Sequence, residues 1–117
     1  MAILVATDRD VLVIDVDRGT SASGHGIIGP PTCLAAARLV NARAWCGTHR
    51  DGVFRSDDGG RSWQSVGFVG KHITAVTADP VKRDIVWVGT EPSEVWRSVD
   101  AGDRTRRDSG EDQEYRR

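Results

Sequence analysis

Short stretches of apolar residues run along the chain, and turn residues separate them. The segment 73–78 (ITAVTA) is rich in β-branched residues and ends at an Asp-Pro turn. The run 84–90 (DIVWVGT) is almost continuously apolar, which is typical of a strand covered on both faces, whereas 94–98 (EVWRS) alternates. The segment 62–66 (SWQSV) also follows a turn and predicts another strand. Because turn residues interrupt every window long enough for a helix, the pattern predicts an all-β chain.

The same pattern recurs along the chain with a period of about 40 residues. Shifted forward by 42 positions, residues 47–63 fall on residues 89–105 without a gap, and Trp45 falls on Trp87. Shifted back by 41 positions, the same segment falls on residues 6–22. This backward shift pairs Thr7 with Thr48, Leu12 with Val53, Asp17 with Asp58 and Gly19 with Gly60. Four short strands in each period are the unit of a propeller blade.

The motif SDDGGRSW at 56–63 contains the most specific signal in the chain. Its aspartate Asp58 can accept hydrogen bonds from backbone N–H groups and hold a turn, and Gly60 can adopt a positive φ at little cost. Trp63 supplies a large apolar side chain that can pin the hairpin against its neighbours. We therefore expect Asp58→Ala to destabilise the chain and Asp57→Ala to be nearly neutral, because Val99 occupies the position equivalent to Asp57.

This motif matches the pattern Ser-x-Asp-x-Gly-x-Ser/Thr-Trp at every specified position and resembles the Asp box, or BNR repeat. The Asp box occurs in sialidases, sortilin-type receptor domains, xyloglucanase-like hydrolases and photosystem II assembly-factor-like propellers. The surrounding sequence is most similar to the sortilin and assembly-factor branch. In the family the turn joins the third and fourth strands of a blade, away from the catalytic centre. The positions that the resemblance assigns to this structural turn are Ser56, Asp58, Gly60, Ser62 and Trp63 in the central box, Ser98, Asp100 and Gly102 in the third, and Asp15, Asp17 and Gly19 in the first.

The resemblance covers residues 2–102 and implies an incomplete β-propeller, an open arc of about two and a half blades with four antiparallel strands each. It divides the chain into a partial blade at 1–30, a blade repeat at 31–72 and a partial blade at 73–102. After Gly102 the pattern ends abruptly, and residues 103–117 form a highly charged tail. Such a composition predicts disorder. The abrupt change also suggests that the chain is a truncated or out-of-frame version of a longer propeller protein, and a genuine polar tail on a small repeat protein is the alternative.

Candidate binding residues lie mainly in the turns after the second strand of each repeat. His49 and Glu91 occupy equivalent positions there, where propellers often recruit ligand-facing residues. Solvated loop residues are the favoured interpretation, and a ligand-facing role is the alternative. Trp45, Trp87 and Trp96 can stack on a sugar or pack in the core, and the repeated position of Trp45 and Trp87 favours packing. No spacing of cysteine or histidine indicates a metal site, and we expect no cofactor.

Sialidase chemistry in this family uses three arginines from different blades and a tyrosine nucleophile. Arg55 and Arg97 are equivalent arginines before the boxes, but Tyr115, the sole tyrosine, lies in the charged tail. We therefore assign no catalytic residue. The leading expectation is a non-catalytic binding or scaffold module for a protein or carbohydrate partner. A fragment of a glycoside hydrolase or sialidase-like enzyme is the alternative, and an assembly or chaperone role is a third.

Net charge, the length of the apolar stretches and the cysteine content narrow the classes of partner and the location of the protein. The 117 residues have a formal net charge of −1 without a basic stripe, which argues against nucleic-acid binding. No apolar stretch approaches a membrane span or a secretory signal, so a cytoplasmic protein is expected. Cys33 and Cys46 lie on predicted neighbouring strands, and two buried free thiols are favoured over a disulfide. Self-association is expected through exposed apolar residues of the terminal blades, namely Val76, Val86 and Val95.

Overall fold

The computed structural model describes residues 2–37, 42–82, 84–99, 105–107 and 114–115. Every regular element in these ranges is a β-strand, which confirms the all-β class. No helix in the described part of the chain is long and apolar enough to cross a membrane. The strands are β1 (Ala2–Ala6), β2 (Val11–Asp15), β3 (Thr20–Ser23), β4 (Pro31–Ala36), β5 (Ala44–Thr48), β6 (Val53–Ser56), β7 (Gln64–Gly67), β8 (His72–Ala78), β9 (Val86–Glu91), β10 (Glu94–Ser98), β11 (Thr105–Arg107) and β12 (Glu114–Tyr115).

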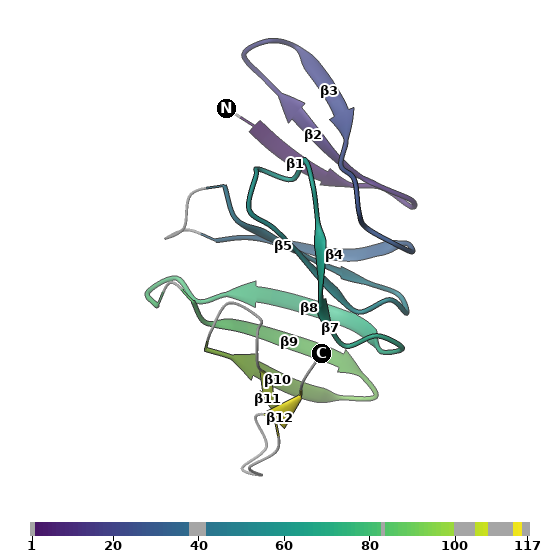
Figure 1. The fold of residues 1–117 in the computed structure, drawn as a ribbon, viewed down its shortest axis with the longest axis vertical. Coiled ribbons are helices and arrows are strands. Elements are labelled where there is room, and N and C mark those ends of the chain that lie inside the picture. Colours follow the sequence, from purple (N-terminus) through teal and green to yellow (C-terminus); the bar gives the residue numbers. More distant parts are fainter. Residues whose placement is uncertain (1, 38–41, 83, 100–104, 108–113, 116–117) are drawn as a thin grey trace.

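These strands form three antiparallel sheets that are stacked along the longest axis of the molecule (Figure 1). The first sheet contains β1–β3, the second β4–β7 and the third β8–β12, and in each sheet strands adjacent in sequence pair with one another. Strands that pair in chain order need only short turns, which explains the Gly, Asp and Pro residues between the apolar runs.

The second sheet lies in the middle and buries both of its faces. Since successive side chains of a strand point to opposite faces, β5 contributes Cys46 to one core and Trp45 to the other. The core toward the first sheet is formed by Val11, Ala44, Cys46, Phe54 and Trp63. The core toward the third sheet is formed by Trp45, Val53, Val66, Phe68, Ile73, Val76, Val86, Val88 and Trp96. All five residues of β5 are buried, as expected for a strand that is covered on both faces.

The second and third sheets repeat each other in strand position and in orientation. Residues separated by 42 positions face the preceding sheet in both: Leu34 and Val76, Ala44 and Val86, Cys46 and Val88, Phe54 and Trp96. The second sheet therefore packs on the first with the same side that the third sheet packs on the second.

In the first sheet, the residues of β2 are offset by one position from those that the 41-residue shift predicts. Ala6 pairs with Val11, whereas Gly47 pairs with Val53. If Ala6 is equivalent to Gly47, as the 41-residue shift states, then Val11 rather than Leu12 is equivalent to Val53. Burial agrees, since Val11 and Val53 are each 1 % exposed and Leu12 is only half-buried. Four residues separate the paired Ala6 and Val11, whereas five separate the paired Gly47 and Val53, which accounts for the offset of one residue.

Two expectations about burial need correction. Val76 and Val86 were expected on exposed faces, but they lie in the core between the second and third sheets, while Val95 is 46 % exposed.

Cys33 pairs with Gly47, and Cys46 pairs with Leu34, so the two cysteines are one position out of register and point to opposite faces. Both thiols are free, Cys46 buried and Cys33 half-buried, and burial raises the pKa of Cys46 to about 12.

Two segments of the charged tail extend the third sheet. β11 pairs with β10, and β12 pairs with β11. Backbone pairing does not require apolar side chains, so a charged segment can add a strand to an open sheet edge. The remainder of the tail, where disorder is predicted, lies outside the described residues.

Candidate functional site

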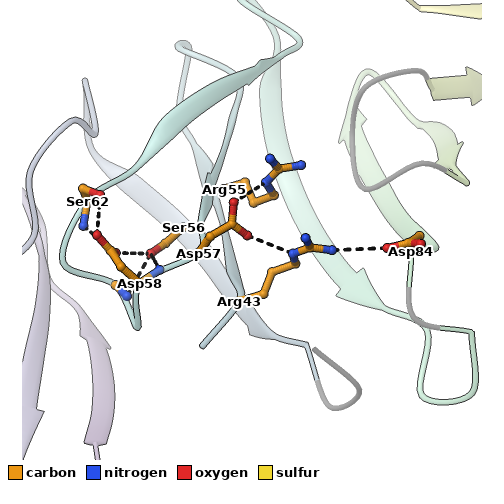
Figure 2. Close-up of polar contacts among 8 residues, drawn as sticks. Arg43, Arg55, Ser56, Asp57, Asp58, Ser62 and Asp84 are labelled. Carbon is orange, nitrogen blue, oxygen red and sulfur yellow. Dashed lines mark hydrogen bonds and ion pairs between the residues drawn. The ribbon is translucent and has the colours of Figure 1, made fainter. Parts of the chain in front are cut away.

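The central Asp box forms the turn between β6 and β7, and its polar groups converge on one carboxylate (Figure 2). Asp58 accepts a hydrogen bond from the Ser56 hydroxyl at 2.9 Å, from the Ser62 backbone N–H at 2.8 Å, and from the Ser62 hydroxyl. The Ser56 oxygen in turn accepts the Gly60 N–H at 2.9 Å. Gly60 has φ of 91°, a conformation that favours glycine. The two serines and the aspartate therefore hold both arms of the turn.

This hydrogen bonding lowers the pKa of Asp58 from 3.8 to about 2. The Ser62 hydroxyl is the largest cause, followed by the Ser62 backbone N–H, while the Ser56 hydroxyl contributes less and partial desolvation opposes the shift. Donors that stabilise the ionised form make protonation unfavourable. Asp58 thus remains a carboxylate across physiological pH and serves as a structural acceptor.

Trp63 connects the box to the first sheet. Its side chain is 5 % exposed in the core between the first and second sheets, and its indole N–H donates to the Gly60 carbonyl at 2.9 Å. Its backbone N–H donates to His25 O at 2.8 Å, and His25 N–H donates to Arg61 O at 2.9 Å. A Cβ at Gly24 would lie 2.5 Å from the Gly60 carbonyl oxygen, so the segment after β3 packs tightly against the box.

The corresponding turn between β2 and β3 is built differently. Here the Asp15 carboxylate accepts the backbone N–H groups of Asp17 at 3.1 Å and Arg18 at 3.2 Å. The acceptor is therefore the residue at the end of β2, two positions before the box aspartate named from the sequence. Gly19 has φ of 66°. In the third repeat Ser98 is fully buried, while Asp100 and Gly102 lie outside the described residues.

A chain of ion pairs beside the box links the second and third sheets (Figure 2). Arg43, which precedes β5, lies 2.9 Å from an Asp57 oxygen and 3.3 Å from an Asp84 oxygen. Arg55 lies 3.2 Å from the other Asp57 oxygen. Sequence analysis missed this network because Asp57 occupies a variable position of the motif and Asp84 is remote along the chain. The 42-residue shift places Arg55 on Arg97 but does not predict these ion pairs.

Turns at the opposite end of the sheets bring several polar groups together, and we call this region the histidine end (residues 29–30, 48–52, 69–72 and 90–94). The His49 N–H donates to Pro30 O at 3.0 Å, and the Gly70 N–H donates to Arg50 O at 2.7 Å. The rings of His49 and His72 meet edge to face, with centroids 4.5 Å apart. His72 pairs with Glu91 between β8 and β9, so both predicted loop residues lie around His72, which sequence analysis did not select.

Two further contacts order the histidine end. Lys71 forms an ion pair with Glu94 at 3.5 Å and lies 5.6 Å from the ring centroid of buried Trp96. The buried Thr48 hydroxyl donates to Gly52 O at 2.7 Å and accepts the Asp51 N–H at 3.0 Å. The hydroxyls of Thr7 and Thr90, at equivalent positions, also bond to their own turns. The threonine match between the repeats was the sequence signal for this role.

The tryptophans that were candidates for sugar stacking are mainly structural. Trp45 and Trp96 are 2 % and 6 % exposed in the core between the second and third sheets, which confirms packing for both. Trp87 differs, because it is half-buried on the far face of the third sheet, with the Arg97 guanidinium 5.6 Å from its ring centroid. Trp87 is therefore a half-buried aromatic side chain at the outer surface of the third sheet.

Chemically, the two ends of the sheets offer different possibilities. The box end holds an ionised aspartate that accepts several hydrogen bonds. The histidine end holds the exposed side chains of His49 and Glu91 beside the half-buried side chains of His72, Lys71 and Glu94. Within the described residues, no three His, Cys, Asp or Glu side chains are grouped so that they could hold a metal ion. An open hollow of about 150 Å³ adjoins the first turn and is lined in part by Asp15, Arg18 and Arg61.

Comparison with known proteins adds no family. No protein-family model matches the chain, and no curated protein matches its sequence. The functional reading therefore depends on the geometry described above.

Proposed function

We propose that the chain is an Asp-box propeller module that acts as a non-catalytic binding or scaffold unit for a protein or carbohydrate partner. The observation that carries the proposal is the clustering of polar side chains at the histidine end, with His49 and Glu91 exposed, while the box end is occupied by structural hydrogen bonds. Binding residues lie disproportionately on loops held by a rigid scaffold. The buried sheets provide such a scaffold.

Three features support the propeller part of this proposal. The second and third sheets have equivalent strands 42 positions apart, they stack in the same orientation, and the box turn joins the third and fourth strands of the second sheet. A series of sheets that stack in one orientation is the arrangement of propeller blades.

The charge at the histidine end indicates the kind of contact it makes. His49 and Glu91 are exposed and both adjoin His72, and the ion pair of Lys71 with Glu94 adds one charge of each sign. Mixed donors and acceptors suit a partner with both hydrogen-bond donors and acceptors, such as sugar hydroxyls or a peptide backbone. They do not suit a uniformly charged polymer.

The test is a binding screen of the purified chain against a glycan array and a random peptide library. Ligands recovered from either screen should lose binding to the double variant His49→Ala/Glu91→Ala. The double variant Arg18→Ala/Lys82→Ala, which changes exposed residues away from the histidine end, is the matched control. Ligands that bind the histidine-end variant normally, or hydrolysis of sialosides or xyloglucan by the chain, would contradict the proposal.

A further inference from the structure

The outer face of the first sheet is apolar and has no sheet packed on it in the described part of the chain. Leu4 and Val13 point toward the second sheet, where they would contact a Cβ at Gly60. Their neighbours in sequence must point the other way. This outer face contains Ile3, Val5, Leu12 and Ile14, of which Ile3 is 44 % and Val5 37 % exposed.

The outer face of the third sheet is likewise uncovered by any described sheet. Val86, Val88 and Trp96 point toward the second sheet, so Trp87, Val95 and Arg97 lie on the far side. Val95 is 46 % exposed, and the Arg97 guanidinium lies over the Trp87 ring rather than apart from it. The cross-strand neighbours of Trp87 on this face are Arg97 and Thr77, so the face combines the apolar side chains of Trp87 and Val95 with two polar ones.

By the repeat, these two outer faces are equivalent to the two kinds of face that pack against each other between neighbouring sheets of the chain. Trp87 and Val95 occupy the positions of Trp45 and Val53, which are 2 % and 1 % exposed because the third sheet covers them. At the other end of the stack, Ile3 and Val5 occupy the positions of Ala44 and Cys46, which are 3 % and 0 % exposed because the first sheet covers them.

We infer that a second copy of the chain covers each of these faces, with the outer face of its first sheet packed on the outer face of the third sheet. The contact is head to tail, because each copy contributes a different surface. Such heterologous contacts either close into a ring or continue as an open assembly. The inference rests on the proposed stacking of propeller blades but not on the partner of the histidine end, so the two proposals can fail separately.

Complementation between two interface variants tests this directly. Ile3→Asp places a carboxylate on the first-sheet face, and Val95→Asp places one on the third-sheet face. Burying an unpaired carboxylate against apolar side chains is costly, so each variant should dissociate more than about tenfold more readily than wild type. Light scattering coupled to size-exclusion chromatography should show wild-type dimers or larger species and monomers for each variant alone.

An equimolar mixture of the two variants should form a 1:1 heterodimer, because one intact face of each kind remains. Val81→Asp, at a 77 % exposed position in the turn between β8 and β9, is the matched control and should assemble like wild type. Circular dichroism checks that each variant keeps its sheet structure. If either aspartate variant unfolds, Ile3→Thr and Val95→Thr keep the β-branched shape and should weaken assembly in the same complementary way.

Four results would overturn the inference. They are a wild-type monomer at all concentrations, a variant mixture that stays monomeric, full assembly of either variant alone, and equal loss of assembly in Val81→Asp. Full assembly by Val95→Asp alone would specifically indicate that two first-sheet faces pair with each other.

Discussion

The turn between β6 and β7 and the turn between β2 and β3 occupy corresponding places in neighbouring sheets, yet they are held in different ways. In the box turn Asp58 accepts hydrogen bonds from both serines, and Trp63 closes the turn from the core side. In the first turn Asp15 accepts two backbone N–H groups, and no tryptophan follows. A hairpin can therefore form without the box motif, and the additional function of the box is to attach one sheet to the next.

The largest difference should come from the tryptophan. Trp63→Ala removes a buried indole from the core between the first and second sheets and should lower the free energy of unfolding by about 3–5 kcal/mol. Trp87→Ala, a half-buried position on the outer face of the third sheet, is the control and should cost less than half as much. Urea denaturation followed by circular dichroism measures both. Equal losses would show that the box tryptophan does not join the sheets.

Removal of the two turn carboxylates should give the next largest difference. Asp58→Ala leaves donors from Ser56 and Ser62 without their acceptor and should cost about 1–2 kcal/mol. Asp15→Ala removes an acceptor of two exposed backbone N–H groups and should cost about 0.5 kcal/mol, at the low end for a single hydrogen bond. Thermal melts of the two variants make the comparison. A greater loss for Asp15→Ala would reverse the assignment of the box as the stronger turn.

Acidification should weaken the box turn without mutation. The folded pKa of Asp58 is about 2 and its unfolded value is near 3.8, so its contribution to stability is present above pH 3.8 and is lost as pH falls toward 2. Over this window the wild type should lose more stability than Asp58→Asn, which cannot titrate at this position. Parallel stability curves between pH 5 and pH 2 would contradict the lowered pKa.

Asp57→Ala should have a small effect, but not the neutral one expected from the sequence. Asp57 contacts both Arg43 and Arg55, whose side chains are only 16 % and 18 % exposed. Its own side chain is 44 % exposed, which screens the ion pairs and limits the loss to about 0.5–1 kcal/mol. Asp84→Ala breaks one pair and should cost less. A double-mutant cycle with Arg43→Ala measures the coupling, and zero coupling would show that the network contributes nothing.

How much the sequence could predict depended on the separation of the interacting groups. The box was foreseeable because Ser56, Asp58 and Ser62 lie within one turn. The ion pair between Arg43 and Asp84 joins residues 41 positions apart in different sheets, and no local pattern reports such a contact.

The one-residue offset in the first sheet has another cause. Val11 and Leu12 are both apolar, so composition cannot choose which of them faces the core, whereas strand pairing and burial do. The two strands in the charged tail were missed because they are held by backbone pairing.

The most direct test is hydrogen exchange measured residue by residue by NMR. It shows whether the box turn, which joins the first two sheets, is held more tightly than the turn between β2 and β3. The amide of Gly60 and the indole N–H of Trp63 should exchange slowly, because both donate buried hydrogen bonds within the box. The amides of Asp17 and Arg18 should exchange much faster, since their bonds to Asp15 are exposed. Equally fast exchange at both turns would contradict this account of the box, whereas protection of the two buried box groups alone is the result we predict.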